Sequence, residues 1–376
     1  MPHRLAGVGA PPSAYVHVPF CHRVCPYCDF AVVAGRLSDA DRYVSAVVRE
    51  IECSDAWEPL GAVFIGGGTP SAVDPKLIGQ LLGALEAKHG FQRDMEITLE
   101  SNPEDWAPEK AEGMLSAGVN RVSIGAQSFD PVVLAALGRQ HGPDDVGAAV
   151  AVCRSEGFNS VSLDLIFGHP METTSSWSDT LRRVTDLAPD HVSAYALTVE
   201  RGTQLSREVS AGSPAPDDDD QADRYEATLE AMAAAGLERY EVSNFSQIGR
   251  ECRYNRRVWA HGSYEAYGLG AHGYRDGVRF RNVRALDAYL ARVEAGESAR
   301  AGREALEGWP LELERMMVGL RRIEGVELGP GGAAFLASEE GQRLVHAGVV
   351  SQEGDRLVVT NPLMTDAVIR ATLALP

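Results

Sequence analysis

Short apolar runs rich in β-branched residues alternate with amphipathic stretches along the first half of the chain. The apolar runs predict strands at residues 15–20, 62–65, 96–100, 121–125, 160–167 and 191–197. The stretches between them predict helices near residues 38–53, 75–89, 108–117, 143–157 and 174–187. Strand alternating with helix is typical of the α/β class, in which helices cover a parallel sheet. The repeated units predict an open, partial (β/α)6 TIM-like barrel.

The pattern changes in the second half of the chain. A helix at 219–235 and a strand at 239–242 precede an irregular, aromatic and glycine-rich stretch at about 243–282. Helices at 311–322 and 333–347 and a hairpin turning at residues 353–355 predict a small, winged-helix-like C-terminal α+β domain. It lacks a clustered basic face, which favours a structural or lid role over DNA binding. The predicted organisation is a tail (1–14), a barrel (15–242), a linking aromatic and glycine-rich segment (243–305) and a C-terminal helix and hairpin domain (306–376).

Charge and hydropathy narrow the class of protein. The net charge is −18, from 35 Lys and Arg against 53 Asp and Glu, and a diffusely acidic surface disfavours nucleic acid as a partner. No apolar run reaches the roughly 18 residues needed to span a bilayer, and residues 1–14 lack the apolar core of a signal peptide. We therefore expect a cytoplasmic protein without a transmembrane segment. The acidic run 217–220 is interpreted as a loop and helix N-terminus rather than a metal site.

Three of the six cysteines lie within eight residues, as Cys21, Cys25 and Cys28, directly after the first predicted strand. Three thiolates on one loop can hold three irons of a [4Fe–4S] cluster and leave the fourth iron open for a small chelating molecule. A structural zinc site would need a fourth ligand, and His22 is poorly placed to supply it. The spacing C-x3-C-x2-C is the signature of the radical S-adenosylmethionine (AdoMet, SAM) superfamily. This resemblance implies that AdoMet chelates the open iron and is cleaved to a 5′-deoxyadenosyl radical.

Polar residues cluster at the ends of the predicted strands, where barrel enzymes place their chemistry. The turn Gly66-Gly67-Gly68-Thr69-Pro70 follows the second strand, and its glycines allow backbone groups to approach a ligand closely. Glu100 ends the third strand and suits ribose hydroxyls, while Gln127 and Arg139 follow the fourth. Asp164 lies inside the fifth strand, where a carboxylate is costly unless it is hydrogen-bonded. That cost indicates a ligand or a structural network.

Together these stretches resemble the oxygen-independent coproporphyrinogen III oxidase family, a radical SAM family with a barrel and a small C-terminal domain. The similarity runs from Tyr15 to the C-terminus and is carried by the stretches 15–21, 66–70, 100–103, 125–129 and 164–168. It implies that Tyr15, Gly67, Glu100 and the cysteine loop contact a cluster-bound AdoMet. It implies a second AdoMet surrounded by Tyr27, Gly68, Thr69, Gln127, Arg139, Asp164 and Ala196.

One position separates two branches of this family. The oxidases carry a fourth cysteine two residues after the third, whereas this chain has Phe30 there. The chain is similar in this respect to the haem chaperone branch, and the stretches 240–245, 251–253 and 268–272 support the same branch. The resemblance implies a cluster, AdoMet and bound haem, with haem-accepting proteins such as respiratory enzymes as partners. It implies that coproporphyrinogen oxidase activity is absent, while AdoMet cleavage stays open.

The branch typically shows His-Asn-x-x-Tyr-Trp after Cys-Arg, a motif associated with haem, but here Tyr254 replaces the histidine of the motif and Val258 replaces its tyrosine. Tyr254 can ligate ferric haem as a tyrosine does in catalase. His272, His261 and Cys252 are the other candidates, each with packing or hydrogen bonding as the ordinary alternative. Nearby aromatic residues suit stacking on a macrocycle or an ordinary core, namely Trp259, Tyr264, Tyr267 and Tyr274.

The sequence thus predicts a radical SAM haem chaperone. Two enzymatic functions remain as alternatives, an oxygen-independent coproporphyrinogen III dehydrogenase and a radical SAM enzyme that opens or methylates haem. Phe30 argues against the first, and the stretch 240–255 against the second. A purely structural cluster protein is disfavoured, because the cysteine loop and the glycine-rich turn occur together.

Overall fold

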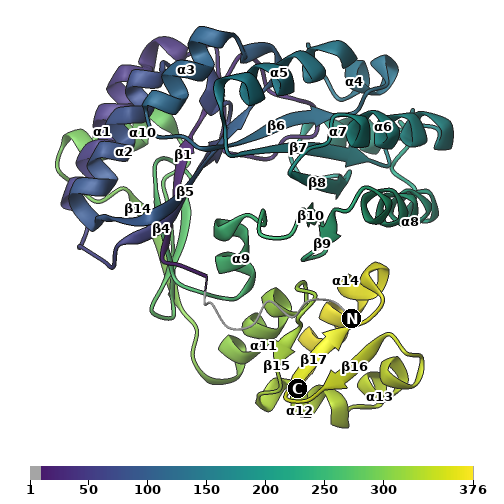
Figure 1. The fold of residues 1–376 in the computed structure, drawn as a ribbon. Helices are drawn as coiled ribbons and strands as arrows, with labels where there is room; N and C mark the ends of the chain where they lie inside the picture. Colours follow the sequence, from purple (N-terminus) through teal and green to yellow (C-terminus); the bar gives the residue numbers. More distant parts are fainter. Residues whose placement is uncertain (1–9, 376) are drawn as a thin grey trace.

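A computed structural model describes residues 10–375 and shows a mixed sheet with helices on its outer side (Figure 1). The sheet contains twelve strands in the order β14-β13-β12-β11-β1-β4-β5-β6-β7-β8-β10-β9. Six neighbouring parallel strands form its centre, β1 (Ser13–Val18), β4 (Leu60–Gly67), β5 (Phe91–Ser101), β6 (Arg121–Gln127), β7 (Ser160–Phe167) and β8 (His191–Ala196). No ladder within residues 10–375 joins β14 to β9, so the sheet stays open, as the sequence predicted.

Most residues of the central strands are buried, which explains why these strands appear in the sequence as apolar runs; the exposed ones are residues 93–94 of β5 and 195–196 of β8. Helices between the strands cover the outer face, and neighbouring helices pack on one another. Several begin with a proline in the first turn or with an aspartate or threonine N-cap, both of which favour helix initiation. The covering helices are α1 (Ala40–Cys53), α2 (Pro75–His89), α3 (Pro108–Ser116), α5 (Pro143–Glu156), α6 (Thr174–Asp186) and α8 (Asp218–Ala234).

Short elements fill the connections and were not predicted. The cysteine loop is bounded by a small parallel pair, and two short helices follow the fourth and sixth barrel strands. These elements are β2 (Phe20–Cys21), β3 (Val33–Ala34), α4 (Pro131–Ala136) and α7 (Gln204–Ser210). Residues 1–9 lie outside the described part of the chain, so the tail predicted for 1–14 is described only from residue 10, and β1 already begins at Ser13.

The prediction that residues 243–282 are irregular is wrong, because regular elements occur throughout the predicted linking segment (243–305). This stretch adds strands to both edges of the sheet: β10 pairs antiparallel with β8, and β11 pairs parallel with β1. The strands are too short for a clear alternation, and glycine turns interrupt them. The elements are β10 (Asn244–Ser246), α9 (Arg253–Trp259), β11 (Tyr264–Tyr267), β12 (His272–Arg275), β13 (Val278–Asn282), α10 (Leu286–Glu294) and β14 (Arg300–Ala305), and the edge strand β9 (Glu238–Arg239) comes just before them.

The C-terminal part has its own apolar core, which surrounds the fully buried Phe335. Its strands form a separate sheet in the order β15-β17-β16, and the element order is that of a winged helix, as predicted. The single helix predicted at 333–347 is wrong: Ser338 ends one helix and caps the next by accepting a hydrogen bond from the Gly341 N–H. The elements are α11 (Gly308–Gly319), β15 (Val326–Glu327), α12 (Pro330–Ala337), α13 (Glu339–His346), β16 (Val350–Glu353), β17 (Arg356–Val359) and α14 (Thr365–Leu373).

The C-terminal part is attached to the sheet beside α9, the helix that follows Cys252 (Figure 1). Helix α11 packs against α9, and a β-bridge joins Glu241 to Arg322. Glu314 of α11 accepts from Arg279 of β13 at 2.7 Å and pairs with His261 at 2.8 Å. No helix of residues 10–375 is long and apolar enough to cross a bilayer.

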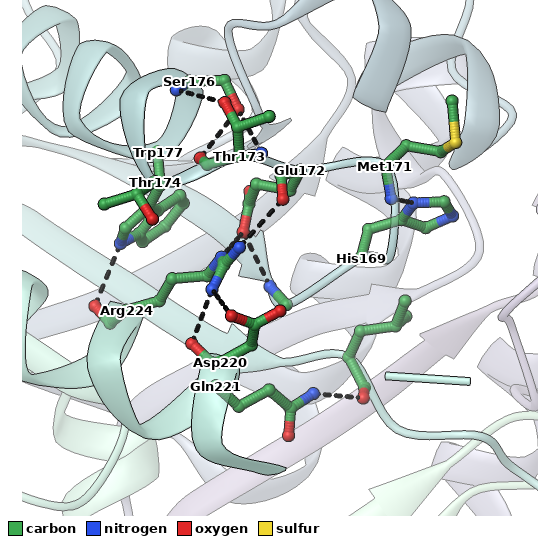
Figure 2. A network of polar contacts seen from close by, with 12 residues as sticks. His169, Met171, Glu172, Thr173, Thr174, Ser176, Trp177, Asp220, Gln221 and Arg224 are labelled. Atoms are coloured by element: carbon green, nitrogen blue, oxygen red, sulfur yellow. Dashed lines mark hydrogen bonds and ion pairs between the residues drawn. The ribbon is translucent and has the colours of Figure 1, made fainter. Parts of the chain in front are cut away.

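A buried ion pair holds α8 against the loop that follows β7 (Figure 2). Glu172 Oε2 lies 2.9 Å from Arg224 Nε and accepts from the Gly168 N–H at 2.8 Å. Arg224 also donates to the Glu172 carbonyl, and its own carbonyl accepts from Trp177 Nε1. Burial raises the pKa of Glu172, while the Gly168 N–H and the Arg224 guanidinium oppose that rise. The pair fixes the connection after β7 at the rim of the barrel.

We expect Arg224→Met to lower the free energy of unfolding by about 3–5 kcal/mol, because the substitution leaves Glu172 as an uncompensated buried charge. Urea denaturation followed by circular dichroism measures this loss. Arg182→Met is the matched control on neighbouring α6: Arg182 pairs with Asp179 and Asp186, all three side chains are exposed, and we expect nearly unchanged stability. Equal losses in the two variants would show that the buried ion pair contributes no more to the free energy of unfolding than an exposed one.

Candidate functional site

A cavity of about 770 Å³ lies at the carboxyl ends of the parallel strands. The cysteine loop, the glycine-rich turn and the polar strand ends all form its wall, since parallel strands bring their carboxyl ends to one edge. Apart from the candidate haem ligand His261, the site residues predicted from the sequence lie on this wall, namely Tyr15, Cys21, Cys25, Tyr27, Cys28, Gly67, Gly68, Thr69, Glu100, Gln127, Arg139, Asp164, Ala196, Cys252, Tyr254 and His272. The cavity therefore brings together groups that lie up to 257 positions apart, from residue 15 to residue 272.

The three clustered cysteines are partly buried, and hydrogen-bond donors face their sulfur atoms. Thr69 Oγ1 lies 3.5 Å from Cys21 Sγ, and Arg139 Nη1 lies 3.8 Å from Cys25 Sγ. Burial raises the pKa of the Cys28 thiol to about 11, against the opposing hydrogen bond from the Phe30 backbone. Donors aimed at sulfur stabilise the thiolate that a bound iron requires.

The donor set fits a cubane cluster better than a single metal ion. Among residues 10–375, no three His, Cys, Asp or Glu side chains converge on a point where one ion would be held. In a cubane each cysteine binds a different iron, so its ligands need not converge. The three soft thiols face one cavity beside a turn that has no room for side chains, which suits a cluster with one open iron.

The glycine-rich turn lies directly against the cysteine loop. A Cβ atom on Gly68 would lie 2.6 Å from the backbone of Pro19, so only glycine fits. Gly67 has φ of 113°, and a Cβ there would meet the His17 ring at 2.4 Å. The Gly67 N–H donates to Glu100 Oε2 at 2.8 Å. The turn therefore presents backbone and carboxylate groups next to the thiols.

Two buried carboxyl groups line the inner part of the cavity. Burial raises the pKa of Glu100 to about 7, and Asp164 raises it further against the effect of the Gly67 N–H. Burial also raises the pKa of Asp164, while hydroxyls of Ser193 and Ser123 oppose this rise. Ser123 Oγ lies 2.8 Å from Asp164 Oδ2. Asp164 thus belongs to a structural network, and together with Glu100 it favours a cationic ligand.

Arg139 and Gln127 show features that are common in residues of binding sites. Arg139 donates to Asn102 Oδ1 at 2.5 Å and to the Gly125 carbonyl at 3.2 Å, yet its buried Nε has no partner within residues 10–375. Gln127 adopts φ of 61°, in the left-handed region that non-glycine residues seldom occupy. Backbone strain of this kind concentrates at functional sites. Asn102, between Arg139 and Thr69, was not among the predicted contacts.

The candidate haem ligands occupy two depths of the cavity. Tyr254 packs on Tyr15 and Phe64, with ring centroids 6.0 and 5.2 Å away, and burial raises its pKa well above the ordinary value. Cys252 is buried, which raises its pKa to about 12. Tyr254 therefore packs within an aromatic cluster and Cys252 is enclosed, although both lie on the cavity wall. His272 is exposed at the rim. The protein around its ring excludes part of the solvent, and this partial desolvation, together with the charge of nearby arginines, lowers the pKa of His272.

His261 lies off the cavity wall, as do three of the aromatic residues considered for stacking. His261 pairs with Glu314 and packs on Tyr274, at a ring-centroid distance of 4.6 Å. Tyr267 is buried and hydrogen-bonds His89, and Trp259 lies under Arg321. Of the aromatic residues named for stacking, Tyr264 lines the cavity.

His17 lines the cavity and was missed by the sequence reasoning. Tyr15 Oη lies 2.9 Å from His17 Nδ1, and His17 Nε2 lies 2.9 Å from the Ala31 carbonyl. The carbonyl accepts, so Nε2 carries the proton and Nδ1 accepts from the tyrosine hydroxyl. Burial lowers the pKa of His17 to about 4. The spacing of two residues, which places His17 on the same strand face as Tyr15, was the signal available.

Comparisons with known proteins agree on the family. The model of the radical SAM superfamily matches residues 15–184. The heme chaperone HemW of Mycobacterium tuberculosis is 38% identical over 97% of this chain and 95% of its own length. That of Bacillus subtilis is 34% identical over 84% of each chain, and that of Escherichia coli 36% over 70% of each.

Among solved structures, coproporphyrinogen III oxidase (HemN) from Escherichia coli superposes with a TM-score of 0.83 over 96% of this chain and 90% of its own. At 23% identity this likeness concerns the fold, and it supports the predicted α/β radical SAM barrel. Membership of the radical SAM superfamily implies a [4Fe–4S] cluster and S-adenosylmethionine. From the identity along nearly the whole chain, this protein belongs to the HemW family of the radical SAM superfamily.

Proposed function

We propose that this chain is a haem carrier, which binds haem and delivers it to haem proteins on a barrel that holds a [4Fe–4S] cluster and AdoMet. The observation that carries the proposal is the 38% identity over 97% of the chain to proteins named heme chaperones. The gathering of all candidate groups on one cavity wall is consistent with it. The accepting haem proteins, respiratory enzymes among them, are the partners that this function requires.

In this proposal Cys21, Cys25 and Cys28 hold three irons of the cluster. Binding of iron releases the thiol protons, and the donors from Thr69, Arg139 and the Phe30 backbone then stabilise the sulfur charge. A cluster with an open iron supplies one-electron chemistry to a chelated AdoMet. The glycine turn keeps the space beside that iron free of side chains.

AdoMet carries a positive sulfonium, and the two inner carboxyl groups suit it. Glu100 accepts from a ribose hydroxyl or the methionyl ammonium, while Gly67 and Tyr15 line the same part of the wall. Gly68, Thr69, Tyr27 and the residues beyond them line the space for a second AdoMet. In this second set, Gln127, Arg139, Asp164 and Ala196 complete the wall.

For haem, we assign the axial ligand to His272. It is exposed at the rim, and its lowered pKa keeps the imidazole neutral and able to bind iron. Tyr254 would need to become a phenolate within a packed aromatic cluster, which its raised pKa opposes. Cys252 is disfavoured because its side chain is buried, whereas His272 is exposed at the rim.

We expect AdoMet affinity to fall as the pH falls below 7, because protonation of Glu100 removes an anionic acceptor. The dissociation constant should rise by about fivefold between pH 7 and pH 6, since half of the Glu100 side chains are already protonated near pH 7. Equilibrium dialysis of the reconstituted protein between pH 6 and 8 measures it. Glu100→Gln should bind AdoMet weakly at every pH. The ratio of its dissociation constant to that of the unmodified protein at the same pH cancels the titration of AdoMet itself. The control Glu200→Gln removes an exposed rim carboxylate of the same cavity and should keep the pH profile. An unchanged pH profile in Glu100→Gln would contradict the assignment.

Anaerobic titration with ferric haem, followed in the Soret band, tests the carrier function. We expect saturable, stoichiometric binding, loss of the shifted band in His272→Ala, and its retention in Tyr254→Phe. Loss in Tyr254→Phe alone would move the ligand to the tyrosine. Absence of saturable binding in the unmodified protein would reject the carrier function. Incubation with reduced coproporphyrinogen or haem and AdoMet then tests the enzymatic alternatives, which require a new tetrapyrrole product together with 5′-deoxyadenosine.

A further inference from the structure

The loop that carries the cysteines exposes large apolar side chains to solvent. Phe30 is 62% exposed and Val24 is 49% exposed, and both lie between the short paired strands β2 and β3. Both also line the cavity that holds the candidate site. Exposed aromatic side chains at the rim of a cavity are a common sign of a ligand surface.

The backbone around Phe30 is fixed, so the exposure of the ring is not that of a loose loop. The Phe30 N–H faces the sulfur of Cys28, and the Phe30 carbonyl accepts from the Val32 N–H at 2.9 Å. Val33, three residues on, donates to the Pro19 carbonyl and pairs in the β2–β3 ladder. The same bonds that order the cysteine loop therefore hold the phenyl ring outside.

Positive charges flank this apolar surface in a chain whose net charge is −18. Arg23 lies on the same loop, and Arg284 Nη2 donates to the Asp29 carbonyl at 2.7 Å. Both arginines line the cavity. His272 lies on the same wall, and Gly270, two residues before it, meets Ala31 so closely that a Cβ would lie 2.5 Å from the Ala31 Cβ.

We propose that the porphyrin of haem lies against the outer side of the cysteine loop, with the Phe30 ring on its face, Val24 at its edge, and Arg23 or Arg284 paired with a propionate. The proposal deepens the haem-carrier function and rests on it. A planar apolar macrocycle with two carboxylates matches an apolar surface between two guanidinium groups. AdoMet does not match it, since its sulfonium favours the carboxyl groups inside the cavity.

Face contact and iron ligation are separated by comparing ferric haem with metal-free protoporphyrin IX, which has the same ring and propionates but no iron. We expect Phe30→Ala to raise the dissociation constant of both ligands by about tenfold, the scale of a lost aromatic contact. Phe30→Trp should restore both affinities. His272→Ala should weaken haem alone, because it removes an iron ligand and leaves the surface intact.

The matched control is Val132→Ala on α4, where an apolar side chain is 53% exposed but lies off the cavity wall. It should leave both affinities unchanged. Iron and sulfide content is measured in every variant, and Phe30→Leu, which keeps an apolar side chain on the loop, serves if Phe30→Ala loses its cluster. If the Phe30 variants bind both ligands as tightly as the unmodified protein, the proposal that the porphyrin lies on the Phe30 ring is wrong, and the carrier function is unaffected. Failure of the unmodified protein to bind either ligand would overturn both.

Discussion

The close contact between the turn after β4 and the loop after β1 is the constraint on which the site depends. The Gly68 N–H donates to the Val18 carbonyl at 2.8 Å, and the Thr69 N–H donates to the Phe20 carbonyl at 2.7 Å. These bonds continue the parallel pairing of the two strands past their ends and into the cysteine loop. They need backbones without side chains at Gly67 and Gly68, since any Cβ would collide with His17 or Pro19. Through this contact the sheet sets the position of the thiols.

The carboxyl groups inside the cavity are hydrogen-bonded by hydroxyls and a backbone N–H group rather than by oppositely charged side chains. Asp164 is surrounded by serine hydroxyls, and Glu100 is bound by the Gly67 N–H. Burial raises the pKa of both carboxyl groups, and these hydrogen bonds lower it only in part, so the pKa of each group stays raised. The buried pair of Glu172 and Arg224 differs, because its charges cancel and it supports the rim. The interior is thereby prepared for a cation, while structural charge is compensated elsewhere.

The barrel and the cavity residues could be predicted because local patterns encode them. Buried strands give continuous apolar runs, and polar residues directly after such runs must meet at one edge. Residues 243–305 gave no such signal, since their strands of three to six residues are too short to show a period. One sequence signal was present in this segment but was not used. Asp276 and Gly277 form an Asp-Gly pair, and both have positive φ between β12 and β13, as an Asp-Gly hairpin turn requires. The break between α12 and α13 also has a local sequence signal, since Ser338 is a typical helix N-cap residue. The packing of Tyr254 could not be predicted, because it depends on Tyr15 and Phe64, which lie far away in the sequence.

The segregation of charge within the cavity also bears on how a carrier would release its cargo. Carboxyl groups lie inside, near the thiols, whereas Arg23, Arg284 and His272 lie on the cysteine loop and at the rim. Ligands of opposite charge are thereby directed to different depths, and neither needs to leave for the other to bind. A haem placed on an exposed surface keeps one face toward solvent, where an accepting protein can supply a new iron ligand before His272 dissociates. A deeply buried haem would require the barrel to open first, and the ion pair of Glu172 and Arg224 holds the connection after β7 against such an opening.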